Sequence, residues 1–230
     1  MEALQSDLRV CSFDRPGNDY SAPLPDDWTI DDALAWHNKV ILALDAGTPT
    51  IAGHSLGGAY ALAYAARYPT RAVILLDGLS PEVADAVVGR MGSYSSLTVP
   101  AQMGLLRPIA GTFVSDDYAD YDADLLAQMQ ALRSRSQTIV AFAEDGSLAA
   151  DGLTTSALSD AVDTLDVLVL ILASAETDVP EGQAFYESLR ALHDTYPQST
   201  LITVPEARHY AIVIHVDQLK EHVLDWMDAQ

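Results

Sequence analysis

The segment at residues 53–58 reads GHSLGG and contains the pattern G-x-S-x-G around Ser55. This pattern is typical of a nucleophilic serine on a sharp turn between a strand and a helix. Glycines beside such a turn allow the flanking backbone to pass closely, because they carry no Cβ atom. The segment therefore predicts that the Ser55 hydroxyl is available for attack; the alternative is a serine that only caps a helix.

A serine hydroxyl is a weak nucleophile near neutral pH and needs a base within hydrogen-bond reach. We expect this base to be His209, which lies in the loop EARHY directly after an apolar, strand-like run. Sites in doubly wound sheets collect at the carboxyl ends of the strands, where the Ser55 turn also lies. The remaining histidines fit packing or surface positions better: His37, His54, His193, His215 and His222.

The base in turn needs a carboxylate that orients it. Asp178 is our first choice, because it follows the apolar run DVLVLILAS and precedes His209 in the chain, and Glu176 is a close second. Asp77, which ends the run RAVILLD, is a third candidate, although turn amides often satisfy a carboxylate in such a position. The order serine, acid, histidine differs from the order in the two protease families with this chemistry.

Apolar strand-like runs alternate with amphipathic helical patterns along the chain. The expected strands cover 8–14, 48–52, 71–77, 166–174 and 199–205, and the expected helices cover 29–47, 59–69, 181–197 and 216–227. Such alternation predicts an α/β fold with a doubly wound, mostly parallel sheet, because the crossover helices must lie on both faces of the sheet.

The pattern changes between residues 81 and 163, where helical segments occur without an obvious strand. One of them is expected to form a helix through 121–144. We therefore expect a single domain, with a core from residues 1–80 and 164–230 and a helical cap or lid insertion at 81–163.

The composition excludes several classes of partner. Among 230 residues, 33 are acidic and 12 are basic, which gives a net charge of −21 and argues against nucleic acid and anionic membranes as partners. No apolar stretch is long enough to span a membrane and no signal peptide is visible, so we expect a cytoplasmic protein. The single cysteine, Cys11, lies in the expected strand at 8–14 and is expected to be a buried, inert thiol. The histidine spacing indicates no metal site, and we expect no cofactor.

Three segments, in this order, resemble the α/β-hydrolase superfamily: CSFDRPGNDYS, GHSLGGAYALAYAARYP and PEARHY. The resemblance extends over nearly the whole chain and is to the serine esterases and lipases of this fold. It implies that Ser55 is the nucleophile and His209 the base, and that the backbone N–H of Leu56 donates to the oxyanion. The implied reaction is hydrolysis of small to medium carboxylic esters through an acyl-enzyme intermediate.

The sequence departs from the family at its start. Relatives carry two or three strands before the segment that matches 8–14, and a loop with a His-Gly pair supplies a second oxyanion donor. Here seven residues precede Leu8, so we expect the strand at 8–14 to pair directly with the Ser55 strand and the loop at 14–18 to supply that donor. An exposed strand edge would favour a homodimer.

Two alternatives to an esterase stay open. The same residues can serve carbon-carbon bond hydrolysis or perhydrolysis, and the absent oxyanion segment is compatible with a catalytically silent protein that binds a ligand or partner.

Overall fold

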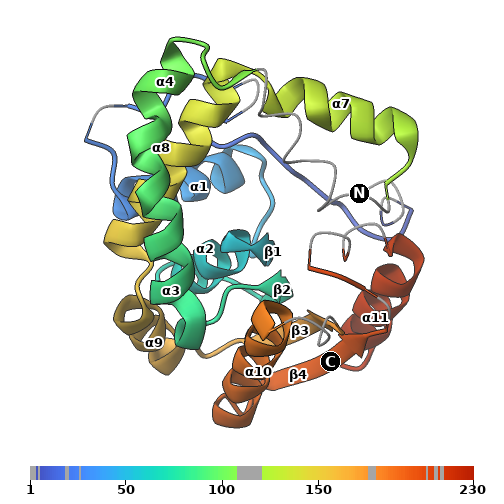
Figure 1. Cartoon of the computed structure of the whole chain (residues 1–230). Coiled ribbons are helices and arrows are strands. Elements are labelled where there is room, and N and C mark those ends of the chain that lie inside the picture. Colours follow the sequence, from blue (N-terminus) through green and yellow to red (C-terminus); the bar gives the residue numbers. More distant parts are fainter. Residues whose placement is uncertain are drawn as a thin grey trace. The chain divides into compact units, whose positions relative to one another are not determined.

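The computed structural model describes residues 4, 6–18, 21–25, 27–107, 121–175, 180–205, 207–209, 212 and 215–230. The chain divides into two compact units, whose helices and strands are labelled in Figure 1. One contains residues 1–29 and 86–152, and the other contains residues 30–85 and 153–230. Residues 1–29 therefore group with residues 86–152 in this division, and the extent of the cap or lid insertion stays a prediction.

The second unit is built on a parallel sheet. In the described residues its strands follow the order β1 (Thr50–Ser55), β2 (Ala72–Gly78), β3 (Leu168–Ser174) and β4 (Ser199–Val204). All three neighbouring pairs are parallel. The central strands β2 and β3 are almost continuous runs of buried apolar residues, as expected for strands covered on both faces. These four strands match runs that the sequence predicts.

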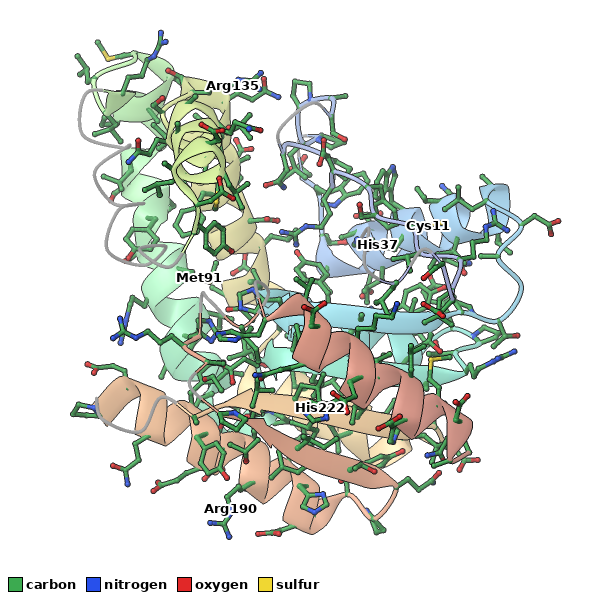
Figure 2. All side chains as sticks on the ribbon, turned by 90° about the vertical axis from the view of Figure 1, so that its right-hand side faces the viewer. Cys11, His37, Met91, Arg135, Arg190 and His222 are labelled. Carbon is green, nitrogen blue, oxygen red and sulfur yellow. The ribbon has the colours of Figure 1, made fainter. Side chains whose placement is uncertain are left out.

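Helices precede, connect and follow these strands in the chain. They are α1 (Ile30–Ala43), α2 (Leu56–Ala65), α9 (Thr155–Thr164), α10 (Pro180–Thr195) and α11 (Val216–Asp228). Nearly every residue of α2 is buried, which agrees with a helix that is apolar on all sides. The other helices are amphipathic, and their polar side faces solvent; Arg190 on α10 is one such exposed residue (Figure 2).

The helices cover both faces of the sheet. Side chains of α2 and α10 pack with every second residue of β2 and β3 in one buried cluster. The hydroxyl of Tyr186 on α10 lies 3.0 Å from the hydroxyl of Thr203, whereas the indole N–H of Trp226 on α11 donates to Thr200 at 3.3 Å. Thr200 and Thr203 point to opposite faces of β4, because side chains alternate along a strand. The expected doubly wound arrangement is therefore confirmed.

The expected strand at 8–14 is wrong. Residues 9–15 have no regular secondary structure, and Cys11 and Phe13 are exposed. Cys11 is consequently not the buried thiol that the sequence indicated. A β-rich composition gives only a side-chain preference, since a strand exists only where a neighbouring backbone pairs with it. In the part of the chain that the structure describes, β1 pairs with β2 alone.

The first unit is organised around α8 (Ser136–Gly152), which packs against η2 (Ser93–Leu97), α4 (Thr98–Gln102) and α7 (Ala123–Arg133). The last part of α3 (Pro81–Gly92) also approaches α8 closely. A Cβ atom at Gly146 would lie 2.5 Å from the carbonyl oxygen of Met91, so glycine is required at this crossing.

The helix expected through 121–144 is two helices, α7 and α8, separated at Ser134 and Arg135. Asp122 caps α7 through hydrogen bonds from the N–H groups of Asp124 and Leu125, as a preferred N-cap residue does. Among the helices that the structure describes, none has the length and apolar character needed to cross a bilayer.

Candidate active site

Ser55 occupies a strained turn between β1 and α2. Its backbone adopts φ 51° and ψ −125°, a region that residues other than glycine rarely occupy. Strain of this kind persists only where the surrounding structure enforces it, and it is common at functional sites. Because α2 begins at Leu56, directly after the turn, the Ser55 side chain is held at the carboxyl end of β1.

Two glycines make the turn possible. A Cβ atom at Gly53 would lie 2.0 Å from the carbonyl oxygen of Gly57, and one at Gly58 would lie 2.6 Å from the Cα atom of Gly78 on β2. A Cβ atom at Gly57 itself would meet nothing within 4 Å. The steric requirement therefore falls on Gly53 and Gly58, and the second glycine of G-x-S-x-G is not needed for space.

His209 lies within hydrogen-bond reach of Ser55. The serine Oγ is 2.9 Å from Nε2 of His209, and the Nδ1 atom of the same ring is 2.6 Å from Oδ2 of Asp77. Nδ1 donates to the carboxylate, so Nε2 is free to accept the serine proton. The side chain of His209 is partly exposed, whereas Asp77 is almost completely buried. The three side chains form a continuous hydrogen-bonded series from hydroxyl to carboxylate.

A bulge places Asp77 in this series. The register of β1 and β2 runs from His54 opposite Leu76 to Ser55 opposite Gly78, so Asp77 is an extra residue in β2. Its φ of 46° is another positive value outside glycine. Bulges redirect side chains and occur frequently near active sites. Here the bulge turns the carboxylate toward His209.

Ser174 at the end of β3 completes the surroundings of the carboxylate. Its backbone N–H donates to Oδ1 of Asp77 at 2.9 Å, and its hydroxyl donates to Oδ2 at 2.8 Å. Burial by itself would raise the pKa of Asp77, but the hydrogen bond and charge of His209 and the two donors of Ser174 together hold that pKa below its usual value. Asp77 is therefore ionised at neutral pH.

The structure thus brings together three of the residues singled out from the sequence: Ser55, His209 and Asp77. Asp77 ranked third among the acids, as a carboxylate satisfied by turn amides; it does accept a backbone N–H, from Ser174, but it also binds the imidazole. Asp178 and Glu176, which ranked above it, lie outside the described residues.

Sequence reasoning missed two neighbours of His209. The Nε2–H of His54 donates to the backbone carbonyl of His209 at 2.8 Å, and the two rings are 5.0 Å apart. Phe185 on α10 meets the His209 ring edge-to-face, with 4.9 Å between the ring centroids. Burial, followed by the nearby charge of His209, lowers the pKa of His54 from 6.5, so His54 is neutral near pH 7.

The other histidines lie on helices or at a helix start. His37 on α1 makes ring contacts with Trp36 and Tyr60. His193 on α10 is bonded to Ser199, and His215 precedes α11. Figure 2 shows His222 on α11.

Leu56, whose backbone N–H is expected to act as an oxyanion donor, lies at the start of α2. The first backbone N–H groups of a helix have no partner within the helix and carry its partial positive charge, and Leu56 is the first residue of α2. The loop at 14–18, expected to supply a second donor, is engaged within the first unit: Arg15 forms an ion pair with Asp145 at 2.6 Å, and Asn18 also contacts this carboxylate.

The histidine nitrogens named above are hydrogen-bonded within the site. Both ring nitrogens of His209 are occupied by Ser55 and Asp77, and Nε2 of His54 binds a carbonyl oxygen. A metal ion would have to break these hydrogen bonds to bind either ring nitrogen of His209 or Nε2 of His54. In the described residues no group of three or more histidine, cysteine or acidic side chains is arranged to hold a metal.

The fold has many counterparts among solved structures. An enol-lactonase from Burkholderia xenovorans LB400 has a TM-score of 0.71 and 18% identity, over 99% of this chain and 84% of that one. MenH from S. aureus has a TM-score of 0.69 and 19% identity, over 94% and 82% of the two chains. A thermophilic esterase from Thermogutta terrifontis has a TM-score of 0.67 and 20% identity, over 94% and 78%.

The sequence itself gives one family-level match. No curated protein matches it significantly. The family model described as alpha/beta hydrolase fold matches residues 1–216, which is most of the chain and includes Ser55, Asp77 and His209. The chain therefore belongs to the alpha/beta hydrolase fold family.

Proposed function

We propose that this protein is a serine ester hydrolase that cleaves small to medium carboxylic esters. The observation that carries the proposal is the series Ser55 Oγ, His209 and Asp77, with separations of 2.9 and 2.6 Å. A hydroxyl, an imidazole and a buried carboxylate in this order make a nucleophile with its base and the group that orients the base. The similar structures include a protein described as an esterase and one described as an enol-lactonase, and both names refer to ester bonds.

In the first half of the reaction, Ser55 Oγ attacks the ester carbonyl carbon while Nε2 of His209 accepts the hydroxyl proton. The negative charge that develops on the carbonyl oxygen is stabilised by the backbone N–H of Leu56 and the start of α2. When the tetrahedral intermediate collapses, the bond between carbon and the alcohol oxygen breaks, and His209 returns its proton to the leaving alcohol. An acyl group is then bonded to Ser55.

In the second half, a water molecule replaces the alcohol. His209 removes a proton from the water, the resulting oxygen attacks the acyl carbon, and the proton returns to Ser55 as the carboxylic acid leaves. Asp77 remains ionised throughout; it keeps the Nδ1–H tautomer of His209 and stabilises the imidazolium that forms in each half. Its pKa, which lies below the usual value, supports this role.

The proposal is tested with p-nitrophenyl esters of increasing acyl length and a fluorophosphonate probe. We expect the probe to label Ser55, and Ser55→Ala to lose both labelling and turnover, by up to about 10⁶-fold where turnover is large enough to measure. Unchanged turnover in Ser55→Ala would refute the serine mechanism. Labelling of Ser55 without turnover of any ester in the series would contradict the assignment to esters and point to carbon-carbon bond cleavage, perhydrolysis or ligand binding alone.

A further inference from the structure

The side chain directly before the nucleophile is bonded to the backbone of the base. His54 and Ser55 are the last two residues of β1, and their side chains contact the same residue in two places. Ser55 meets the ring of His209 at Nε2, and His54 meets its carbonyl oxygen at 2.8 Å. A carbonyl oxygen only accepts, so Nε2 of His54 carries the proton of this bond.

His209 lies in a loop between two regular elements. It lies between the end of β4 at Val204 and the start of α11 at Val216, in a stretch where the described residues form no strand and no α-helix. The backbone contacts on either side are a long hydrogen bond of 3.4 Å from Ala207 to Val204 and one of 2.8 Å from Ile212 to Arg208. Ala207 and Ile212 are buried and anchor the two sides of the loop. Neither of these two hydrogen bonds involves the backbone of His209.

The ring of His209 is restrained from a further element, α10. Phe185 packs edge-to-face against it. The carbonyl oxygen of Phe185 accepts a hydrogen bond from Ser188, whose hydroxyl also accepts one from Ser80 just beyond β2. Both serines are completely buried, so Phe185 is held firmly. Phe185 limits where the ring of His209 can lie, whereas the hydrogen bond from His54 acts on the backbone of His209.

We propose that His54 is a positioning residue, which fixes the backbone of His209 so that Nε2 stays within reach of Ser55 Oγ. The inference rests on the proposed function, in which His209 is the base. Because His54 and Ser55 are joined by one peptide bond, this hydrogen bond ties the base to the strand that carries the nucleophile. The path from Ser55 through His209 and back through His54 is a closed ring of covalent and hydrogen bonds, so nucleophile and base move together.

The lowered pKa of His54 agrees with its role as a neutral hydrogen-bond donor. Burial and the adjacent charge of His209 both lower the pKa of His54. His54 therefore stays neutral when His209 becomes an imidazolium during the reaction, and it remains a donor to the carbonyl without placing a second positive charge 5.0 Å away.

Three variants separate a hydrogen-bonding role from a space-filling one. Glutamine in His54→Gln has an amide nitrogen at about the reach of Nε2, whereas methionine in His54→Met has a similar length and no donor. Asparagine in His54→Asn is polar but too short. We expect His54→Met and His54→Asn to lose about 10- to 100-fold in kcat with KM within about threefold, because a small displacement of a catalytic group is costly. His54→Gln should recover at least about a third of the wild-type kcat.

The rate at which the fluorophosphonate labels Ser55 should follow the same order, since labelling also needs an activated serine. This readout does not require ester turnover, so it tests His54 even if the preferred substrate is not an ester. Thermal unfolding of each variant establishes that it is folded. Equal labelling rates in folded His54→Gln and His54→Met, or full activity in His54→Met, would overturn the proposal.

A measurement on the wild-type protein covers the case in which the variants do not fold. The ¹⁵N chemical shifts of the His54 ring should show a protonated Nε2 and an unprotonated Nδ1 over about pH 6 to 8. The opposite tautomer would overturn the role of His54, because the hydrogen bond to His209 could not exist. Failure of the proposed function looks different: in that case Ser55→Ala retains activity while the His54 tautomer is as expected.

Discussion

Ser174 donates both its backbone N–H and its hydroxyl to the carboxylate of Asp77, at 2.9 and 2.8 Å, from the end of the neighbouring strand. With His209, the carboxylate accepts three hydrogen bonds while it is almost completely buried. Burial without partners would favour a neutral acid, which could not stabilise an imidazolium. The pairing of β2 with β3 thus places Ser174 where it helps to keep Asp77 ionised.

Replacement of Asp77 decides which carboxylate orients the base. Asp77→Asn keeps the shape of the side chain but removes its charge and favours the wrong tautomer of His209, so we expect kcat to fall by about 10³- to 10⁴-fold. The comparison variant is Asp178→Asn, for which we expect a change within about threefold. Steady-state kinetics on one ester suffices. A larger loss in Asp178→Asn than in Asp77→Asn would reverse the assignment.

Loss of the Ser174 hydroxyl should weaken the site without abolishing it. In Ser174→Ala the backbone N–H still donates to Asp77, but Oδ2 loses one of its two donors. We expect the free energy of unfolding to fall by about 1 to 2 kcal/mol, because a buried charged acceptor loses a partner, and kcat to fall by about tenfold. Urea denaturation and kinetics measure the two effects. The exposed Ser96→Ala is the control, and an equal loss there would show that the effect is not specific to Asp77.

Much of the sheet unit follows from the sequence, since β2 and β3 are buried on both faces and read as continuous apolar runs. The strand predicted at 8–14 was wrong because side-chain pattern alone does not make a strand. Its side chains suit a strand, but a strand needs a paired backbone, which no local pattern can reveal. The break between α7 and α8 was missed because the helical pattern continues through Ser134 and Arg135.

The candidate site was predictable only in part. Ser55 and His209 could be identified from the sequence because each follows an apolar run, and parallel strands bring their carboxyl ends together. Asp77 also follows an apolar run. It was ranked third because the bulge that turns its carboxylate toward His209 has no sequence signature. The roles of His54 and Ser174 depend on hydrogen bonds between residues far apart in the chain, which residue spacing does not predict.

The two outer glycines of G-x-S-x-G should respond differently to substitution. In Gly53→Ala the new Cβ would lie 2.0 Å from the carbonyl of Gly57, so the turn must rearrange. We expect a loss of stability of at least about 3 kcal/mol and loss of Ser55 labelling. In Gly57→Ala the Cβ meets nothing within 4 Å, and alanine is favoured over glycine in a helix, so stability should stay equal or rise by up to about 1 kcal/mol. Thermal melting of both variants tests the contrast; equal destabilisation would contradict it.

His54 should make the stability of the protein depend on pH in a known direction. The pKa of His54 is lowered from 6.5 in the folded protein, so below pH 6.5 the unfolded chain binds a proton that the folded protein does not. The free energy of unfolding must therefore fall as the pH drops through 6.5, by at most about 1.4 kcal/mol per pH unit from this group, until the folded pKa is passed. Asp77 contributes in a separate pH range: its pKa is lowered from 3.8, so its contribution to stability is lost only below that pH.

Urea denaturation of wild type and His54→Gln at about pH 7.5 and pH 5.5 isolates the contribution of the histidine, because glutamine does not titrate. We expect wild type to lose more stability than His54→Gln between the two pH values, and equal losses would show that His54 does not resist protonation in the folded state.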